Sequence, residues 1–339
     1  MKEVKIGLIG CGGMGAGLVK RVATVDGVKI VATADPDAEA GERVAKEFGA
    51  KAYTDYADLL RHPGVEAVIV ASPPFAHAEE TIAAAQAGKH VFCEKPMAPT
   101  VAECEQMIAA CEKAGVKLMI GQVLRYYPNW WKIISLVRSG DFGQPIGVVV
   151  TRIGGGFGAA NRPWRESKEQ SGGLLMEINA HELDFMRCIC GEADSVFANM
   201  GLWRQPKTIL ADQCFVMIHY RSGASGVLHS SHASALGESS GMVLCEKGTI
   251  RYGGGFSGKI QCAWFDKDTE EISLEDIKKE DPVREETRRF VEAVQKDEPV
   301  PITGTDGKRA VELAEAAYLS YERGEPVKLP LTENIDLAV

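Results

Sequence analysis

The chain has 339 residues, more than a single hydrophobic core usually serves, so we expect two domains. The composition, 45% hydrophobic and 25% charged, is that of an ordinary globular protein. The net charge of −9 and the scattered acidic residues argue against nucleic acid or anionic membranes as partners.

The N-terminal segment MKEVKIGLIG enters a strand-like run directly and lacks the features of a signal peptide. No run of about 18 apolar residues is present, so no membrane span is expected. The nine cysteines lie singly, apart from Cys188 and Cys190, which are too close together and too few for a metal site. This cysteine pattern indicates reduced thiols and a cytoplasmic location.

Residues 1–122 alternate β-branched runs with amphipathic stretches, a pattern typical of a parallel sheet built from βαβ units. Two of the intervening helices should end at the C-cap glycines Gly88 and Gly115. We expect strands at 4–10, 28–35, 67–72, 90–95 and 117–122. These elements predict a doubly wound Rossmann domain over residues 1–122.

Residues 123–339 predict an α+β domain with a largely antiparallel, open sheet. A helix through NWWKIISLVRSG and the strand PIGVVVTRI precede a glycine-rich loop over 154–173, and a loop of that length is typical of a lid or binding segment. A helix carrying MEINAHELD, residues 176–184, follows the loop. We then expect strands at 193–202, 211–221, 224–232, 241–252 and 259–265, and helices at 283–296 and 305–323.

A glycine-rich turn follows the first expected strand and opens a helix. Its six residues are Gly10, Cys11, Gly12, Gly13, Met14 and Gly15, which fit G-x-G-x-x-G. Such glycines permit a tight turn, a close approach of a pyrophosphate to the backbone, and close packing of helix on strand. Asp35 ends the second strand, where a carboxylate accepts hydrogen bonds from ribose hydroxyls and repels a 2′-phosphate. The sequence therefore predicts a site for NAD rather than NADP.

Other polar residues stand where later strands end, and ligands of doubly wound folds lie beyond the carboxyl ends of the strands. Accordingly, we expect Ser72, Pro73, His77, Glu94 and Lys95 to border the cofactor. His77 is equally compatible with an ordinary residue at a helix N-terminus.

Lys95 is the most informative of these residues. Its ammonium group could hydrogen-bond a substrate oxygen and stabilise negative charge there, although a solvated lysine at the sheet margin is the alternative. The prolines after Ser72 should delay the next helix until Ala76, and a cis peptide bond before Pro96 is an option.

Several motifs together resemble one known family. GCGGMG with Asp35, then PPFAH, EKP, GQVLRYYPNW, PWRESKEQSGGLLMEINAHELD and TGTDGKRAVELAEAAYLSYERGEPVKLP occur in the order and spacing of the glucose–fructose oxidoreductase and inositol dehydrogenase (Gfo/Idh/MocA) family. The resemblance covers essentially the whole chain. It implies a catalytic set made of the lysine of EKP, an aspartate, and a histidine four residues after it. Lys95 and His181 match this set, and Glu177 replaces the aspartate.

Glu177 and His181 are four residues apart, so on one helix they share a face and could hydrogen-bond. His181 would then accept a hydroxyl proton while a hydride leaves the same carbon. Because glutamate is longer than aspartate, Glu177 could instead face the substrate. Asn179 stands where the family often has a small residue. It would lie on the opposite side of the helix, unless the helix begins later and Asn179 turns inward to a sugar hydroxyl.

Further substrate-binding candidates rest on weaker sequence signals. By analogy with the family, the region after the last Rossmann strand borders the substrate, and the long loop adds basic and aromatic residues. The candidates are Arg125, Tyr126, Tyr127, Arg152, Arg162, Trp164 and Arg165. Arginines near one pocket could hold a phosphate, carboxylate or sulfonate, and the alternative is that they are solvated. No metal site is expected, because His219, His229 and His232 lack acidic partners at a suitable spacing.

Three functional hypotheses follow. The first is an NAD-dependent dehydrogenase that oxidises a secondary hydroxyl of a sugar, cyclitol or sugar derivative. The second is an NAD-dependent glycoside hydrolase that oxidises its substrate transiently and returns the hydride. The third is a non-catalytic NAD- or sugar-binding regulator. The open face of an antiparallel sheet commonly needs a cover, and the resemblance implies a homodimer or homotetramer formed through the C-terminal sheet.

Overall fold

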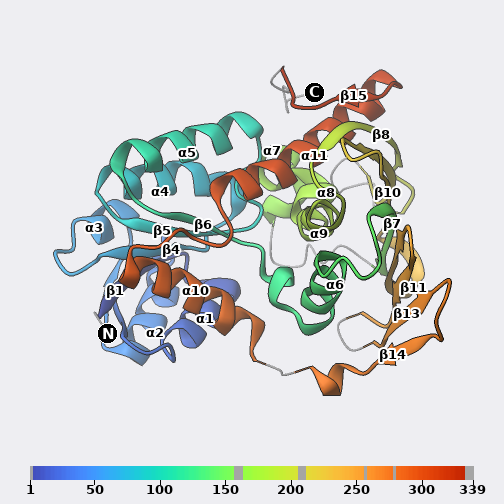
Figure 1. Cartoon of the computed structure of the whole chain (residues 1–339). Coiled ribbons are helices and arrows are strands. Elements are labelled where there is room, and N and C mark those ends of the chain that lie inside the picture. The colour runs from blue at the N-terminus through green and yellow to red at the C-terminus, as the bar shows by residue number, and fades with distance from the viewer. Residues whose placement is uncertain (1–2, 156–162, 205–210, 256–257, 278–279, 333–339) are drawn as a thin grey trace. The chain divides into compact units, whose positions relative to one another are not determined.

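The computed structural model describes residues 3–155, 163–204, 211–255, 258–277 and 280–332, and the chain divides into two compact units (Figure 1). Unit 1 comprises residues 1–123 and 280–308, and unit 2 comprises residues 124–279 and 309–339. This division differs from the expected one in one respect: residues 280–308, expected in the second domain, belong to unit 1.

Unit 1 is built on a parallel six-stranded sheet with the order β3-β2-β1-β4-β5-β6. The strands are β1 Val4–Ile9, β2 Val28–Ala34, β3 Lys51–Tyr53, β4 Ala67–Val70, β5 His90–Glu94 and β6 Leu118–Gly121. The strand order reverses between β1 and β4, and a crevice for a ligand forms at such a switch point. The predicted Rossmann fold is confirmed.

Helices cover both faces of this sheet, with α4 and α5 on one side and α1, α2 and α10 on the other (Figure 1). Their bounds are α1 Gly13–Val22, α2 Ala38–Phe48, α3 Tyr56–Leu60, α4 Pro74–Gln86, α5 Val101–Ala114 and α10 Pro282–Lys296. α10 packs on α1, and Phe290 on α10 contacts Phe92 on β5 edge to face. Residues 280–308 thus complete the core of unit 1.

Local signals explain where these helices begin and end. Asp37 caps α2, and Thr100 and Glu103 form a capping box on α5, which ends at the left-handed Gly115. The expected helix start at Ala76 is wrong, since α4 begins at Pro74. Proline suits the first helical position, where its missing N–H costs no hydrogen bond.

Unit 2 contains a mixed, largely antiparallel sheet with the order β14-β13-β12-β11-β7-β10-β9-β8-β15, in which β10 pairs with β7 in parallel. Its strands are β7 Pro145–Gly155, β8 Ala193–Gly201, β9 Gln213–Tyr220, β10 Ser225–Ser231, β11 Ala233–Cys245, β12 Gly248–Tyr252, β13 Ile260–Trp264, β14 Glu270–Ile272 and β15 Val327–Lys328. The single strand expected at 241–252 is wrong, because the chain turns at Glu246 and Lys247 and forms two strands, β11 and β12.

One face of this sheet is covered and the other is open. α9 packs on β7 and β10, and α6 packs on α9. Along β7, for example, Val148 and Val150 are buried whereas Val149 between them is 41% exposed. The helical elements are η1 Val123–Tyr126, α6 Pro128–Arg138, η2 Pro163–Glu166, α7 Lys168–Ser171, α8 Gly173–Glu177, α9 Ala180–Cys190 and η3 Leu274–Asp276.

The last helix, α11 Gly304–Arg323, begins in unit 1 and ends in unit 2. In unit 2 its Tyr318 hydroxyl accepts a hydrogen bond from the Leu175 backbone at 2.9 Å, and the hydroxyl of its Ser320 accepts one from the Ala198 backbone at 3.1 Å. α11 therefore anchors both α8 and the sheet. None of the helices in the described ranges is long and apolar enough to cross a membrane.

Candidate active site

The glycine-rich turn of unit 1 has the geometry that its sequence predicts. Gly10 has a φ of +87°, and a Cβ atom there would lie 2.5 Å from the Ser72 nitrogen. A Cβ on Gly15 would lie 1.9 Å from the Gly10 carbonyl oxygen, so α1 packs on β1 only because this residue has no side chain. A Cβ on Gly12, in contrast, would meet nothing within 4 Å. Gly12 therefore leaves open space in front of the helix.

The N-terminus of α1 is open to a ligand. Gly12 is the N-cap and contributes no side-chain hydrogen bond, and the first turn carries no acidic residue. Gly12, Gly13 and Met14 are all exposed. Free N–H groups and the positive end of a helix dipole bind phosphate groups well. The turn thus fits the diphosphate of a dinucleotide.

Asp35 stands at the end of β2 and holds the turn in place. Its carboxylate accepts hydrogen bonds from the backbone N–H of Cys11 at 2.6 Å and of Asp37 at 2.9 Å. From α2, Arg43 reaches the Cys11 carbonyl at 3.5 Å. Burial and the nearby Asp35 charge raise the pKa of the Cys11 thiol to about 12, so this thiol stays neutral. A carboxylate beside the turn is suitably placed for the ribose hydroxyls of a bound dinucleotide.

His77 lies between two loops of unit 1. The ring is buried, with Nδ1 2.9 Å from the Pro96 carbonyl oxygen and Nε2 2.8 Å from the Ser72 carbonyl oxygen. The Ser72 hydroxyl donates to the Glu80 carboxylate, and burial raises the pKa of Glu80 to about 7. His77 therefore ties the loop after β4 to the loop after β5.

Lys95 follows directly after β5 and is half-buried. The carboxylate of Glu94 accepts a hydrogen bond from the Lys95 backbone N–H at 3.1 Å, so it turns back on its own loop. The peptide bond between Lys95 and Pro96 is cis, as the sequence allowed. This loop carries the ammonium group of Lys95, which the family resemblance identifies as catalytic.

In unit 2, the segment around His181 departs from the single helix expected over 176–184. α8 ends at Glu177, the chain turns at Ile178 and Asn179, and α9 begins at Ala180 with Asn179 as its N-cap. The argument that Glu177 and His181 share one helical face is therefore wrong. His181 instead lies in the first turn of α9, two residues after the N-cap Asn179.

Glu177 is 4% exposed and forms an ion pair with Arg165, with Nη2 of the arginine 2.5 Å from Oε1 of the glutamate. The Arg165 guanidinium also lies over the Trp164 ring, 5.3 Å from its centroid. Arg165 and Trp164 belong to η2, in the second part of the long loop. The described part of this loop therefore contributes a cation to the Glu177 carboxylate.

Asn179 is fully buried. Its Nδ2 donates to the Glu182 carboxylate at 3.2 Å, whereas its Oδ1 has no hydrogen-bond partner among the described residues. From the sequence, Asn179 was expected to turn inward only if the helix began later than residue 176. α9 does begin later, at Ala180. Glu182 itself was not singled out, although H-E-L-D gave a signal: two carboxylates in the first turns of a helix with a buried face.

Two more arginines of the predicted substrate set also face carboxylates. Arg125 binds Asp184 through two hydrogen bonds, of 2.7 and 2.6 Å. Arg152 on β7 lies 3.8 Å from Glu182. Tyr127, half-buried, is the N-cap of α6. Arg162 lies outside the described residues.

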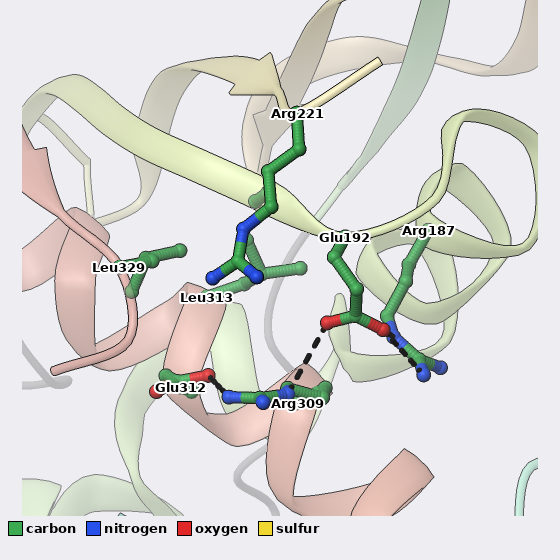
Figure 2. Close-up of a pocket in the computed structure, with 8 residues that line it drawn as sticks. Arg187, Glu192, Arg221, Arg309, Glu312, Leu313 and Leu329 are labelled. Atoms are coloured by element: carbon green, nitrogen blue, oxygen red, sulfur yellow. Dashed lines mark hydrogen bonds and ion pairs between the residues drawn. The ribbon is translucent and has the colours of Figure 1, made fainter.

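A pocket elsewhere in unit 2 contains none of the predicted site residues (Figure 2). It is lined by three arginines and two glutamates, which are largely paired with one another: Arg187 and Arg309 lie 2.8 and 3.2 Å from Glu192, and Arg309 lies 2.5 Å from Glu312. The described ranges contain no group of three histidine, cysteine, aspartate or glutamate residues that could hold a metal ion. His229, a histidine considered as a metal ligand, instead stacks on Phe215 with ring centroids 4.2 Å apart.

An open glycine turn beneath a carboxylate, in a doubly wound sheet joined to an α+β unit, defines a dinucleotide-dependent enzyme of the oxidoreductase class. Residues 4–122 match the family model described as "Oxidoreductase family, NAD-binding Rossmann fold". Residues 134–329 match the model described as "Oxidoreductase family, C-terminal alpha/beta domain". The chain belongs to the Gfo/Idh/MocA oxidoreductase family, whose N-terminal Rossmann domain binds NAD.

Relatives with assigned names differ in their chemistry. The chain is 30% identical to the myo-inositol 2-dehydrogenase of Thermotoga maritima, over 96% of this chain and 98% of the relative. It is 33% identical to the 2,7-anhydro-N-acetylneuraminate hydratase of Escherichia coli, over 58% of this chain and 52% of the relative. The crystal structure of aldose-aldose oxidoreductase from Caulobacter crescentus complexed with glycerol superposes with a TM-score of 0.87 at 26% identity, over 97% of this chain and 100% of that one.

Proposed function

We propose that this protein is an NAD-dependent dehydrogenase that oxidises a secondary hydroxyl of a sugar, cyclitol or sugar derivative. The observation that carries the proposal is the open, uncapped N-terminus of α1 beside Asp35, in a member of this oxidoreductase family. The myo-inositol 2-dehydrogenase relative, which matches over almost the whole chain, supports the choice of a polyol as substrate.

The proposed chemistry assigns one role to each polar residue. NAD, when bound, supplies the hydride acceptor. His181, in the first turn of α9, accepts the proton of the substrate hydroxyl. The Lys95 ammonium donates a hydrogen bond to the substrate oxygen and stabilises the negative charge that develops there. Glu177, through its ion pair with Arg165, positions the segment before His181.

A polyol panel with NAD tests this proposal. We expect NADH to accumulate with at least one neutral sugar or cyclitol, and Lys95→Met to lower kcat by about 10²- to 10⁴-fold with little change in NAD affinity. Lys20→Met is the matched control, because Lys20 forms an exposed ion pair with Glu47 on the surface of unit 1. If Lys95→Met leaves the rate with every substrate unchanged, the proposal is wrong.

The second candidate is a redox-neutral reaction, in which the substrate is oxidised, undergoes elimination, and is reduced again by the same hydride. The hydratase relative favours this candidate. Conversion of a glycoside or anhydro sugar that requires NAD but accumulates no NADH would support it. The same reaction carried out in deuterated water would then place deuterium at the carbon next to the oxidised one.

We also propose that a second copy of the chain covers the open face of the nine-stranded sheet. Register aligns Phe197, Met217, Val227, Val149 and Met242 in one row across five strands, and Met217 is 56% exposed. An apolar row of this kind typically marks a protein interface. Met217→Lys should lower the mass measured by sedimentation equilibrium. A wild-type monomer at micromolar concentration would contradict the proposal.

The cytoplasm is the compartment we propose. All nine cysteines are free thiols, and Cys188 is the one that is not buried. Burial raises the pKa of Cys93, Cys111 and Cys214, so these thiols resist oxidation. Labelling with a thiol reagent after denaturation of protein taken directly from cells should find all nine cysteines reduced.

A further inference from the structure

We infer that the part of the substrate that binds unit 2 is uncharged and donates a hydroxyl hydrogen bond to Oδ1 of Asn179. The inference rests on the proposed function and narrows it, because the sequence left open whether the substrate is anionic. It follows from two features of unit 2: the pairing of three arginines with three buried carboxylates, and the orientation of one buried amide.

The first feature is a balance of charge. Arg125, Arg152 and Arg165 are the described arginines that could have held an anionic substrate group. Each faces its own carboxylate: Asp184 at 2.6 Å, Glu182 at 3.8 Å and Glu177 at 2.5 Å. These carboxylates are 1%, 2% and 4% exposed. Among these described residues, three cations are matched by three anions, so these arginines offer no excess positive charge to an anionic ligand.

Burial makes this balance difficult to disturb. A carboxylate that is withdrawn from water remains charged only while its cation stays beside it, and removing that cation is costly. An anionic substrate group would compete with Asp184, Glu182 or Glu177 for the same guanidinium. Binding such a group therefore incurs the penalty of an unpaired buried charge, whereas binding a neutral group does not.

The second feature is the fixed amide of Asn179. Its Nδ2 donates to Glu182, and the reversed amide would set Oδ1 against that carboxylate, so the observed orientation is the stable one. Oδ1 is therefore an acceptor that points away from Glu182. It is buried and has no partner in the described part of the chain. Leaving a buried acceptor unpaired is unfavourable, and a donor on the ligand relieves that cost.

Asn179 also lies beside the proposed base. It is the N-cap of α9, and His181 is in the first turn of the same helix. We therefore place the hydroxyl that donates to Oδ1 on the same molecule as the hydroxyl whose proton His181 accepts, because the two residues are two positions apart at the start of α9. Vicinal hydroxyls of a sugar or cyclitol meet this requirement, because one can be oxidised while its neighbour donates.

Matched neutral and anionic probes test the inference. The pairs are D-glucose with D-glucuronate, D-galactose with D-galacturonate, and myo-inositol with its 1-phosphate, each assayed with NAD by NADH formation. We expect the neutral member to have the higher kcat/KM, by about tenfold or more, in every pair that turns over. A higher kcat/KM for any anionic member would overturn the inference.

The failure of this inference is separable from the failure of the proposed function. If no member of any pair is oxidised, this result counts against the dehydrogenase proposal. The inference about charge is then tested by binding instead of turnover. Thermal shifts of the NAD-loaded protein should then be larger with neutral members than with anionic ones. The opposite order of thermal shifts would overturn the inference whatever the reaction is.

Two variants probe the amide directly. Asn179→Ala should raise KM for the neutral substrate by about tenfold and change kcat less, because it removes one hydrogen bond to bound substrate. Asn199→Ala, on the exposed side of β8, is the control. Glu182→Gln lets the amide reverse and frees Arg152, so it should lower the neutral-to-anionic ratio of kcat/KM by about tenfold. A Glu182→Gln protein that loses both activities equally would show a merely structural role and contradict the inference.

Discussion

The proposed binding sites of the two units are built from opposite kinds of groups. In unit 1 the proposed cofactor site consists of backbone and of missing side chains: Gly10, Gly12 and Gly15 leave room, and the N-terminus of α1 is uncapped. In unit 2 the proposed substrate site consists of side chains whose charges are already paired, around the turn between α8 and α9. The difference teaches that the proposed cofactor site selects its ligand by open space and backbone N–H groups. The proposed substrate site selects its ligand by hydrogen-bond acceptors among charges that are already paired.

The glycines of unit 1 give the largest expected effect. Gly15→Ala places a Cβ 1.9 Å from the Gly10 carbonyl oxygen, so we expect a loss of at least about 3 kcal/mol in the free energy of unfolding, measured with urea. Gly12→Ala meets no protein atom within 4 Å and should change stability by less than about 1 kcal/mol.

The same Gly12→Ala protein should nevertheless bind NAD about 10- to 100-fold more weakly in calorimetry, because its methyl group occupies the space of the diphosphate. The two variants therefore separate packing from ligand space. Unchanged NAD affinity in Gly12→Ala would break the account of unit 1.

The charge pairs of unit 2 give the next effect. Arg125→Met leaves Asp184 buried at 1% exposure without its guanidinium, and should lower the free energy of unfolding by about 3–5 kcal/mol. Adding Asp184→Leu should restore most of that loss. As a control, Arg61→Met breaks an exposed pair with Asp58 and should cost less than about 1 kcal/mol. Equal losses in the two single variants would contradict the contrast between buried and exposed pairs.

Glu80 provides a pH-dependent effect in unit 1. Burial raises its pKa from 4.5 to about 7, so between these pH values the folded state holds a proton that the unfolded state has released. The free energy of unfolding therefore falls as pH rises through this window, by about 3 kcal/mol in all. Glu80→Gln should remove this fall from a urea series at several pH values, whereas Glu42→Gln on the exposed face of α2 should not. A slope that persists in Glu80→Gln would assign it to another group.

Asp35 should give the smallest effect. Asp35→Asn removes the charge that repels a 2′-phosphate and leaves Arg43 beside the turn, so the ratio of NADP to NAD affinity should rise by about tenfold in calorimetry. Asp37→Asn makes the same change of charge two residues later and keeps a good helix cap, so its ratio should stay near that of the wild type. A rise of equal size in both variants would show that the effect is not local to Asp35.

Most of the fold could be predicted because periodicity and caps are local properties. The central strands β1, β4, β5 and β6 are largely buried apolar runs, and glycines or capping residues bound many of the helices of unit 1. β3 was missed since it has only three residues. The hairpin at Glu246 and Lys247 was missed because its two strands read as one apolar pattern interrupted by a short polar turn.

The candidate site was predictable to different degrees in the two units. The glycine-rich turn is a run of adjacent residues, and Asp35 ends the next strand at a spacing typical of dinucleotide sites, so this geometry could be predicted from the sequence. The break at Ile178 and Asn179 has only a weak local signal, an asparagine followed three residues later by Glu182, as at a helix N-terminus. No proline or glycine marks it, and the apolar pattern runs through it. The partner of Arg125 lies 59 residues away in the sequence, so its pairing emerges only from the fold.

The most direct test of the proposed chemistry is single-turnover hydride transfer from the best neutral polyol to bound NAD, in wild-type protein and in His181→Gln. Removing the base should slow NADH formation by about 10²- to 10⁴-fold, while calorimetry finds NAD binding unchanged. A His181→Gln protein that transfers hydride at the wild-type rate would contradict the central claim.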